Sequence, residues 1–403
     1  DTVTINSGVT LTINTANASC SSLSIGSGSG TATLRFATSG NPKLTVANNI
    51  TVGNSGAANR VGAITFTSGS TLICGKDVIH GTTGNQASVI DMTAGGTFII
   101  GDDLTVSSTG AIWTPGLGTV ELKGTNSFPA IYSSFNNLTI NGSYTNVGTL
   151  TVGGALTGTG RLTQRSNAAL NIGSTSTITS LIATANPNTV NYTGAAQTVK
   201  PIVYNNLGLS GSGKKTLTGV STINGNLTTA GTVTATNEAN FVIGGNLTVG
   251  YGTIMMMGGF NFTVNGNTAI DNTGILGCQN AGGNKTFNGD VAINSGGNWN
   301  VTVDEDFTFG GSYHKDGNHM STGWGTYRFV GIGKTFTGNQ NLSFPPVTID
   351  GTYTNFGLFS VYGEFQGTGA FIQGANSTLN LLSSYPTIAG LVADIYPNTI
   401  NYN

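Results

Sequence analysis

Residues 204–250 read YNNLGLSGSGKKTLTGVSTINGNLTTAGTVTATNEANFVIGGNLTVG and repeat one short pattern. The pair Asn-Leu returns every 20 residues, at Asn206, Asn226 and Asn246. Each copy carries a short alternating run, such as LTV at 247–249, which is preceded by Gly and Asn and followed by Gly. Such a run is typical of a strand of a few residues between tight turns. A fixed period of this size, filled by strands alone, predicts a β-solenoid in which each unit adds one coil.

The same slot continues as Asn267, Asp290 and Asp306. A coil can change its length at the turns, because only the strands pair with neighbouring coils. Asn and Asp suit this slot because they tolerate left-handed backbone conformations, and stacked Asn side chains can hydrogen-bond to one another. Asn-Gly pairs can also mark the hairpins of an antiparallel sandwich or barrel, but the steady spacing favours parallel coils. We therefore predict an all-β fold, a right-handed parallel β-helix with about 20 residues per coil and roughly 20 coils.

Strand alternation also predicts which side chains form the core. Alternate residues of a strand point to opposite faces, so the apolar ones should stack inward and the intervening threonines should face solvent. The inward set in the central repeat is Leu207, Leu227, Phe241, Ile243, Leu247 and Val249.

A longer repeat lies on top of the short one. Residues 138–192 and 347–402 share about 25 of some 55 aligned positions with a single one-residue gap, which marks a duplicated block. We divide one continuous solenoid into a first repeat block, residues 1–203, and a second, residues 204–403. The second block stops with its next coil unstarted and shows no cap. This predicts that the sequence is a segment of a longer repetitive polypeptide, whose export signals lie outside it.

Composition excludes several classes of protein. Only 7% of the 403 residues are charged, against about 25% in ordinary globular domains, and no window has an amphipathic helical period. The net charge is −2 and the basic residues are scattered, so nucleic acid and anionic lipid are not expected partners. No apolar run is long enough for a membrane span. The three cysteines are expected to be small hydrophobes rather than disulfide partners, Cys74 and Cys278 lying many coils apart.

Residues 188–217 read NTVNYTGAAQTVKPIVYNNLGLSGSGKKTL, and NGNLT follows at 224–228. This stretch resembles the repeats of very large surface proteins of Bacteroidota, in which NTVNYNGxxQTVxxxxYxNLxLSGSGxKTL followed by xxNGNLT recurs. The residues that match are 188–192, 197–199, 204, 207, 209–213, 215–217 and 224–228. The resemblance implies an extracellular, cell-surface protein exported by the type IX secretion system, similar to the gliding adhesins. Its implied partners are surface glycans or other extracellular surfaces, and the secretion and motility machinery of the outer membrane.

The best candidate for a ligand contact is the stretch GGSYHKDGNHMSTGWGT at 310–326. The equivalent stretch of the first copy, 106–119, lacks its histidines and about eight of its residues. Aromatic and polar side chains on a loop that leaves a rigid scaffold suit a carbohydrate or protein contact, although a tolerated surface insertion is the alternative. A metal site on the two histidines would need more ligands, and Asp316 alone is near. The predicted contact residues are Tyr313, His314, Asp316, His319 and Trp324.

Acidic residues offer a weaker candidate, a Ca²⁺ site on Asp304 and Asp306. The two residues would share one face of a strand and offer oxygens together with a neighbouring coil. The calcium-binding nonapeptide G-G-x-G-x-D is absent, so a solvated turn is the alternative. No other cofactor is expected.

Parallel β-helix enzymes that degrade polysaccharides, lyases or hydrolases, are the rival class, and a phage tail-spike fibre is a third. Catalysis would need two or three carboxylates, or a carboxylate with Lys or Arg, converging on one cleft. The available sets are Asp304, Asp306 and Arg328, or Asp102, Asp103, Glu121 and Lys123, and nothing in the sequence marks either as a cluster. The sequence therefore favours a non-catalytic segment that is structural and adhesive.

Overall fold

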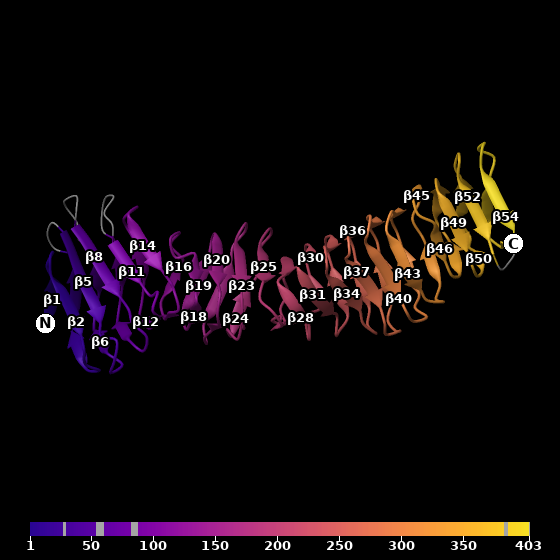
Figure 1. The fold of residues 1–403 in the computed structure, drawn as a ribbon. Coiled ribbons are helices and arrows are strands. Elements are labelled where there is room, and N and C mark those ends of the chain that lie inside the picture. The colour runs from indigo at the N-terminus through magenta and orange to yellow at the C-terminus, as the bar shows by residue number, and fades with distance from the viewer. Residues whose placement is uncertain (27–29, 54–59, 82–87, 383–385, 403) are drawn as a thin grey trace. The chain divides into compact units, whose positions relative to one another are not determined.

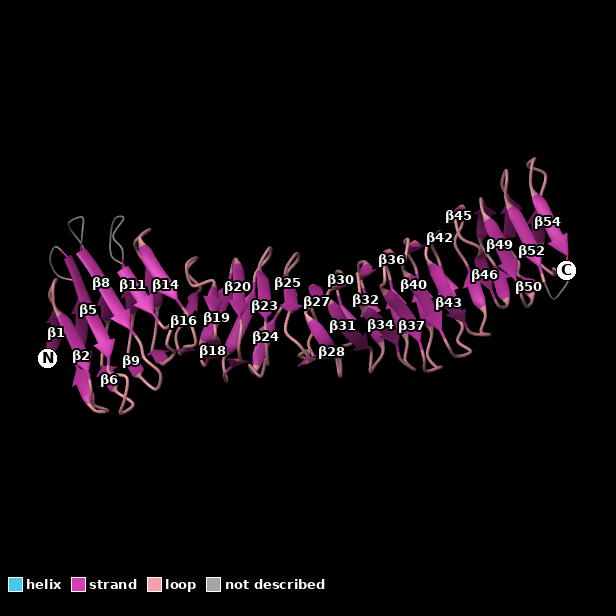
Figure 2. Ribbon diagram, viewed as in Figure 1, coloured by secondary structure: helices cyan, strands magenta, loops and turns pink. Residues whose placement is uncertain are grey.

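The computed structural model describes residues 1–26, 30–53, 60–81, 88–382 and 386–402. For Arg60, His319 and Met320 it describes the backbone alone. The described residues form strands, turns and bends and contain no helix (Figure 1; Figure 2). The predicted all-β class is confirmed.

The strands stack as a parallel β-solenoid of about 19 turns, with roughly 20 residues per turn. Leu207 pairs in register with Leu227, and Leu227 pairs with Leu247 one coil further on. Hairpins would have given antiparallel pairs between consecutive strands, whereas these pairs are parallel and skip the strands between them. The hairpin alternative is therefore wrong.

The chain divides into two compact units, Asp1–Val190 and Asn191–Asn403. In each unit one coil consists of three short strands that belong to three different sheets. Tight turns join these strands, so the side chains that point inward from the three sheets share one continuous core.

Five sheets run through the first unit, in the strand orders that follow. The first is β1 (Thr2–Ile5), β4 (Ser22–Ile25), β7 (Ile50–Val52), β10 (Val78–His80) and β13 (Leu104–Val106). The second is β2 (Thr10–Ile13), β5 (Gly30–Phe36), β8 (Arg60–Thr65), β11 (Ser88–Asp91) and β14 (Ala111–Thr114). The third is β3 (Ala18–Cys20), β6 (Lys43–Val46), β9 (Thr71–Cys74), β12 (Thr97–Ile100), β15 (Thr119–Leu122), β18 (Asn137–Ile140) and β21 (Leu156–Thr157). The later coils add β16 (Thr125–Ser127), β19 (Ser143–Asn146), β22 (Arg161–Gln164) and β24 (Ser180–Ile182), and β17 (Ser134–Phe135), β20 (Thr149–Val152), β23 (Ala169–Ile172) and β25 (Thr189–Tyr192).

Four sheets run through the second unit. The first is β27 (Asn206–Leu209), β30 (Leu227–Thr229), β33 (Leu247–Val249), β36 (Thr268–Ile270), β39 (Val291–Ile293), β42 (Tyr313–Lys315), β45 (Lys334–Thr337), β48 (Thr352–Asn355), β51 (Ala370–Gln373) and β53 (Gly390–Val392). The second is β26 (Gln197–Thr198), β28 (Ser212–Thr216), β31 (Thr232–Thr236), β34 (Ile254–Met257), β37 (Ile275–Cys278), β40 (Asn298–Val301) and β43 (Asn318–Thr322). The third is β29 (Thr222–Ile223), β32 (Phe241–Ile243), β35 (Phe262–Val264), β38 (Lys285–Phe287), β41 (Phe307–Phe309), β44 (Tyr327–Phe329), β47 (Val347–Ile349) and β50 (Phe365–Gln366). The fourth is β46 (Leu342–Phe344), β49 (Leu358–Val361), β52 (Thr378–Leu381) and β54 (Thr399–Tyr402).

The core consists of the inward-facing side chains, stacked coil upon coil. All six residues predicted to point inward in the central repeat are buried, which confirms the assignment of faces. Aromatic rings continue this stacking, since Phe287, Phe309 and Phe329 lie with ring centroids 5.6 and 5.1 Å apart. Cys74 and Cys278 are free and buried, as predicted, and Cys20 is free and partly exposed.

The two halves of the duplicated block form the same series of strands, β18 to β25 and β47 to β54. They also share a buried polar contact. Asn146 donates a side-chain hydrogen bond to Gln164 at 2.7 Å, and Asn355 donates one to Gln373 at 2.8 Å. The two copies therefore share their structure as well as their sequence.

Candidate functional site

The asparagines of the 20-residue slot form a ladder of hydrogen bonds between coils. Oδ1 of Asn206 accepts the backbone N–H of Asn226 at 2.8 Å. Asn226 accepts that of Asn246 and Asn246 that of Asn267, again at 2.8 Å. Each side chain thus ties its own coil to the next one and satisfies a backbone donor at the edge of a strand.

The sequence predicts different chemistry for this slot and is wrong on three points. None of the slot asparagines has a positive φ, so left-handed backbone does not explain them. The bonds that link them run from a backbone N–H to a side-chain oxygen. After Asp290 the slot continues at Ser312, whose backbone N–H donates to the Asp290 carboxylate at 2.8 Å. Asp306, which the sequence assigns to the slot, precedes β41 in another sheet.

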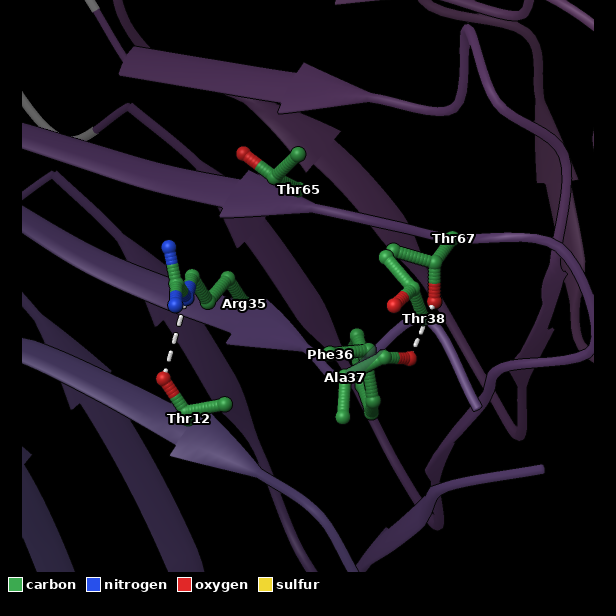
Figure 3. Close-up of a pocket in the computed structure, with 7 residues that line it drawn as sticks. All are labelled: Thr12, Arg35, Phe36, Ala37, Thr38, Thr65 and Thr67. Carbon is green, nitrogen blue, oxygen red and sulfur yellow. Dashed lines mark hydrogen bonds between the residues drawn. The ribbon is translucent and has the colours of Figure 1, made fainter. Parts of the chain in front are cut away.

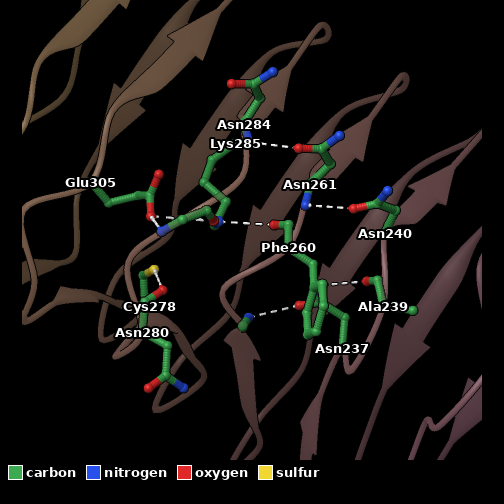
Figure 4. A network of polar contacts seen from close by, with 12 residues as sticks. Asn237, Ala239, Asn240, Phe260, Asn261, Cys278, Asn280, Asn284, Lys285 and Glu305 are labelled. Atoms are coloured by element: carbon green, nitrogen blue, oxygen red, sulfur yellow. Dashed lines mark hydrogen bonds and ion pairs between the residues drawn. The ribbon is translucent and has the colours of Figure 1, made fainter.

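A second ladder runs beside β32, β35 and β38 (Figure 4). Asn240 accepts the backbone N–H of Asn261 at 3.1 Å, and Asn261 accepts that of Asn284 at 2.8 Å. The sequence signal for it was weaker, because these asparagines stand before strands that lack the Asn-Leu pair.

A buried ion pair lies next to this second ladder (Figure 4). Nζ of Lys285 is 3.6 Å from Oε2 of Glu305, and both side chains are buried. Lys285 also donates to the carbonyl oxygens of Phe260 and Gly282, and Glu305 accepts the N–H of Gly282 at 2.6 Å. Lys285 occupies an inward position between Phe262 and Phe307, so the pair fills a place in the core.

The predicted Ca²⁺ ligands Asp304 and Asp306 do not share the face of a strand, because they precede β41. Both are exposed, and each carboxylate accepts a backbone N–H from the next coil. Asp304 binds Trp324 N at 3.0 Å and Asp306 binds Thr326 N at 2.6 Å. Each bond ties this turn to the next coil, as the asparagine bonds do elsewhere.

The predicted ligand-contact loop is not a loop. Most of its residues form β42 and β43, which pair with β39 and β40, the second pair with a register shift between Trp299 and Asn300. Phe98 pairs with Val120, 22 residues on, and Phe307 pairs with Tyr327, 20 residues on. The two coils are equivalent, because each comes directly before one copy of the duplicated block. The coil in the second copy is not longer than the one in the first, so it contains no insertion.

The five predicted contact residues fall into separate environments. Tyr313 is completely buried in the core and is not available to a ligand, which corrects its assignment. The backbone of His319 lies in β43, but its side chain is outside the described residues. Trp324 is 69% exposed and follows β43, whereas His314 and Asp316 lie in and just after β42, in a different sheet.

Among the predicted contact residues whose side chains the structure describes, His314 and Asp316 lie together. Nε2 of His314 lies 3.1 Å from Oδ2 of Asp316, and Nδ1 lies 2.9 Å from the hydroxyl of Thr337. The N–H of Asn339, bound to Asp316 at 2.8 Å, and the neighbouring His314 lower the pKa of the Asp316 carboxyl. Both ring nitrogens of His314 therefore already have partners within the protein.

Two of the groups considered for catalysis, Arg328 and Glu121, already have partners. Arg328 donates to Asp350 at 2.7 Å. The N–H of Thr368 and this arginine lower the pKa of Asp350. Glu121 lies 3.3 Å from Lys123 and accepts a hydrogen bond from Asn141 at 2.9 Å.

Asp102 and Asp103 have a third acidic neighbour that the sequence did not reveal. Oxygens of Asp77, Asp102 and Asp103 lie within 4.8 Å of one another. Partial burial, together with the charges of Asp102 and Asp77, raises the pKa of Asp103. Asp77 accepts the N–H of Asp103 at 3.2 Å, which is again a bond from one coil to the next.

A buried histidine is held in the core of the first unit. Nε2 of His80 donates to the carbonyl oxygen of Ser88 at 3.0 Å, and the hydroxyl of Tyr132 donates to Nδ1 at 2.7 Å. A carbonyl oxygen only accepts, so Nε2 carries a proton, and the hydroxyl of Tyr132 donates to Nδ1 when the ring is neutral. Burial lowers the pKa of His80 to about 4, in agreement with a neutral ring.

The sequence did not indicate a small hollow on the outer face of β2, β5 and β8 (Figure 3). Thr12 pairs with Arg35 and Arg35 with Thr65, so three consecutive coils place these side chains in one row. The spacings are irregular, 23 and 30 residues, and this hides the row from a search for a fixed period. The hollow has a volume of about 370 Å³.

Within the described residues no helix is long and apolar enough to cross a membrane. We compared the chain with protein-family models, with curated proteins and with solved structures. No family model, curated protein or solved structure matches it.

Proposed function

We propose that this chain is a non-catalytic structural and adhesive segment of a large extracellular bacterial surface protein. Its partners are surface glycans or other extracellular surfaces, and its resemblance to exported gliding adhesins of Bacteroidota adds the outer-membrane machinery. The observation that carries the proposal is a row of hydroxyl groups on the outer face of one sheet in the second unit.

This row follows the third sheet of the second unit, with one outward position per coil. Consecutive strands pair these positions in register. In chain order the row is Thr222, Val242, Thr263, Thr286, Thr308, Arg328, Thr348 and Gln366. Neighbouring strands lie about 4.8 Å apart, so the row offers five hydroxyls, three of them on consecutive coils, to a long polysaccharide.

Repetition supplies the strength of such a contact. One neutral hydrogen bond contributes about 0.5–1.5 kcal/mol, which is too little to hold a glycan alone. Linked weak contacts add up when one chain spans many of them. Five threonines in eight positions provide this multiplicity, and the solenoid backbone holds them in place before any ligand arrives.

Retention of the purified segment on immobilised neutral polysaccharide tests the proposal. Replacing Thr263, Thr286 and Thr308 by valine removes three hydroxyls with little change of shape, so retention should fall clearly. Val242→Thr is the matched control, because it adds a hydroxyl to the same row and should preserve or raise retention. Unchanged retention in the triple valine variant contradicts the role of the row.

The rival enzymatic function is tested on the same material. Prolonged incubation of soluble polysaccharide with the segment should release no reducing ends and no unsaturated products. Release of either, abolished by a substitution at Asp304 or Asp306, would overturn the proposal in favour of a polysaccharide-degrading enzyme.

A further inference from the structure

The hollow beside Arg35 brings one cation and several hydroxyl groups together (Figure 3). It is lined by Thr12, Arg35, Phe36, Ala37, Thr38, Thr65 and Thr67. Arg35 is the only charged side chain in this lining, and four of the other six residues carry hydroxyls. Its volume of about 370 Å³ falls within the ~300–1,000 Å³ of small-molecule pockets.

The guanidinium group of Arg35 is oriented by one hydrogen bond. Its Nε donates to the hydroxyl of Thr12 at 3.0 Å (Figure 3). Within the described part of the chain, no hydrogen bond or ion pair engages the two terminal nitrogens. These nitrogens form a planar fork that matches the two oxygens of a carboxylate. The side chain is exposed, so a ligand can reach the fork from solvent.

The surrounding hydroxyls retain free hydrogen-bonding capacity. Thr12 accepts from Arg35, which leaves its own proton to donate. Thr67 donates to the carbonyl oxygen of Ala37 at 2.8 Å, which leaves its oxygen to accept. Both kinds of partner are therefore present around the cation, and sugar hydroxyls need both.

The charges around the hollow favour a single negative charge on the ligand. Asp91 pairs with Thr65 on the next strand, so it lies two coils from Arg35 in the same row. One of its oxygens is occupied by the N–H and hydroxyl of Thr93, at 2.8 and 2.5 Å. A phosphate dianion would leave one charge unbalanced beside one guanidinium, whereas the monoanion of a carboxylic acid would not.

We propose that this hollow binds the carboxylate of an acidic sugar residue, a uronic acid, within a polysaccharide. The fork of Arg35 takes the carboxylate, and the threonine hydroxyls take the ring hydroxyls. This inference deepens the proposed adhesive function and rests on it, since it adds a charge-specific contact to an otherwise neutral hydroxyl surface.

Calorimetric titration of the whole chain with α-1,4-linked tetragalacturonate tests the inference. Its fully methyl-esterified form is the matched ligand, because it keeps the sugar and removes the charge. We expect the ester to bind at least about tenfold more weakly, which is the usual effect of losing one charge-assisted bond pair. Equal binding of the acid and the ester overturns the inference.

Two arginine variants locate the contact. Arg35→Gln should weaken binding of tetragalacturonate by about tenfold or more. Arg161→Gln is the control, because Arg161 is also exposed and bound to a hydroxyl, that of Ser143 at 3.2 Å, but lies outside the hollow. Unchanged binding in Arg35→Gln, or equal losses in both variants, contradicts the assignment.

Two further results separate this inference from its alternatives. Tetraglutamate that binds as tightly as tetragalacturonate would show a site for acidic peptides and overturn the uronic acid. Absent binding of tetragalacturonate, with retention on neutral polysaccharide preserved, overturns the inference and leaves the proposed function standing. Loss of both tetragalacturonate binding and retention on neutral polysaccharide overturns the inference and the proposed function.

Discussion

A single asparagine such as Asn226 belongs to two coils at once. Its backbone N–H is bound by Asn206, and its own Oδ1 binds the N–H of Asn246, both at 2.8 Å. Asn226→Ala removes the acceptor and leaves the N–H of Asn246 to solvent at an exposed turn. We expect a loss of about 1 kcal/mol in the free energy of unfolding, measured by urea denaturation.

Asn226→Asp is the control for this prediction. A carboxylate keeps the acceptor, and the chain itself uses one in this slot at Asp290, which binds the N–H of Ser312. The aspartate variant should therefore stay within about 0.5 kcal/mol of the native protein. If both variants are equally destabilised, the contribution of Asn226 does not come from its acceptor oxygen.

His80 makes the stability of the protein depend on pH. The folded protein holds the ring neutral, with a pKa lowered to about 4, against an ordinary value of 6.5. Between these two values the unfolded chain binds a proton that the folded chain does not. Stability is therefore fully present above pH 6.5 and falls as the pH is lowered towards 4. The full effect of this group is about 3 kcal/mol.

Unfolding in urea at a series of pH values measures this dependence. His80→Gln keeps a donor and an acceptor for Ser88 and Tyr132 but does not titrate. The variant should be less stable at pH 7 and should lose part of the slope between pH 4 and 6.5. A slope equal to that of the native protein would assign the acid sensitivity to other groups.

At the scale of elements, the pairing of strands decides where a charged residue can stand. β38 places Lys285 in the apolar column between Phe262 and Phe307, and the chain before β41 turns Glu305 inward to meet it. Breaking a buried pair leaves a charge without compensation, which typically costs about 3–5 kcal/mol. Glu305→Gln should lower the free energy of unfolding by an amount of this order.

Asp304→Asn tests whether position rather than charge is responsible. Asp304 is adjacent in sequence but exposed, and an amide oxygen can still accept the N–H of Trp324. This variant should change stability by less than about 1 kcal/mol. The double variant Lys285→Met with Glu305→Gln should recover part of the loss, because the unpaired charge is gone.

At the scale of the whole molecule, the sequence predicts the coil well where its period is regular. Asn206, Asn226 and Asn246 are spaced evenly, so both the parallel stacking and the inward leucines followed from them. Residues 313–324 were misjudged for the opposite reason. The sequence alignment of the two copies suggested an insertion, whereas the strand register shows a coil of ordinary length. Strands pair by their position in the coil and not by residue identity.

The sites depend on neighbours that no local pattern contains. Arg35 meets Thr12 and Thr65 only after coils of 23 and 30 residues have been wound, and Asp77 meets Asp103 in the same way. Asp304 and Glu305 differ in exposure although they are adjacent, since one faces the turn and the other the core. Such differences follow from register, which a single sequence fixes only where its repeat is strict.

The asparagine ladder bears on how a chain of this kind evolves. Every joint in it has the same chemistry, a side-chain oxygen on one coil and a backbone N–H on the next. A coil that is copied by gene duplication therefore arrives with both halves of its connector already made. Neither neighbour has to mutate to receive it. Length becomes the property that such a lineage can change most readily, while the chemistry of each joint stays the same.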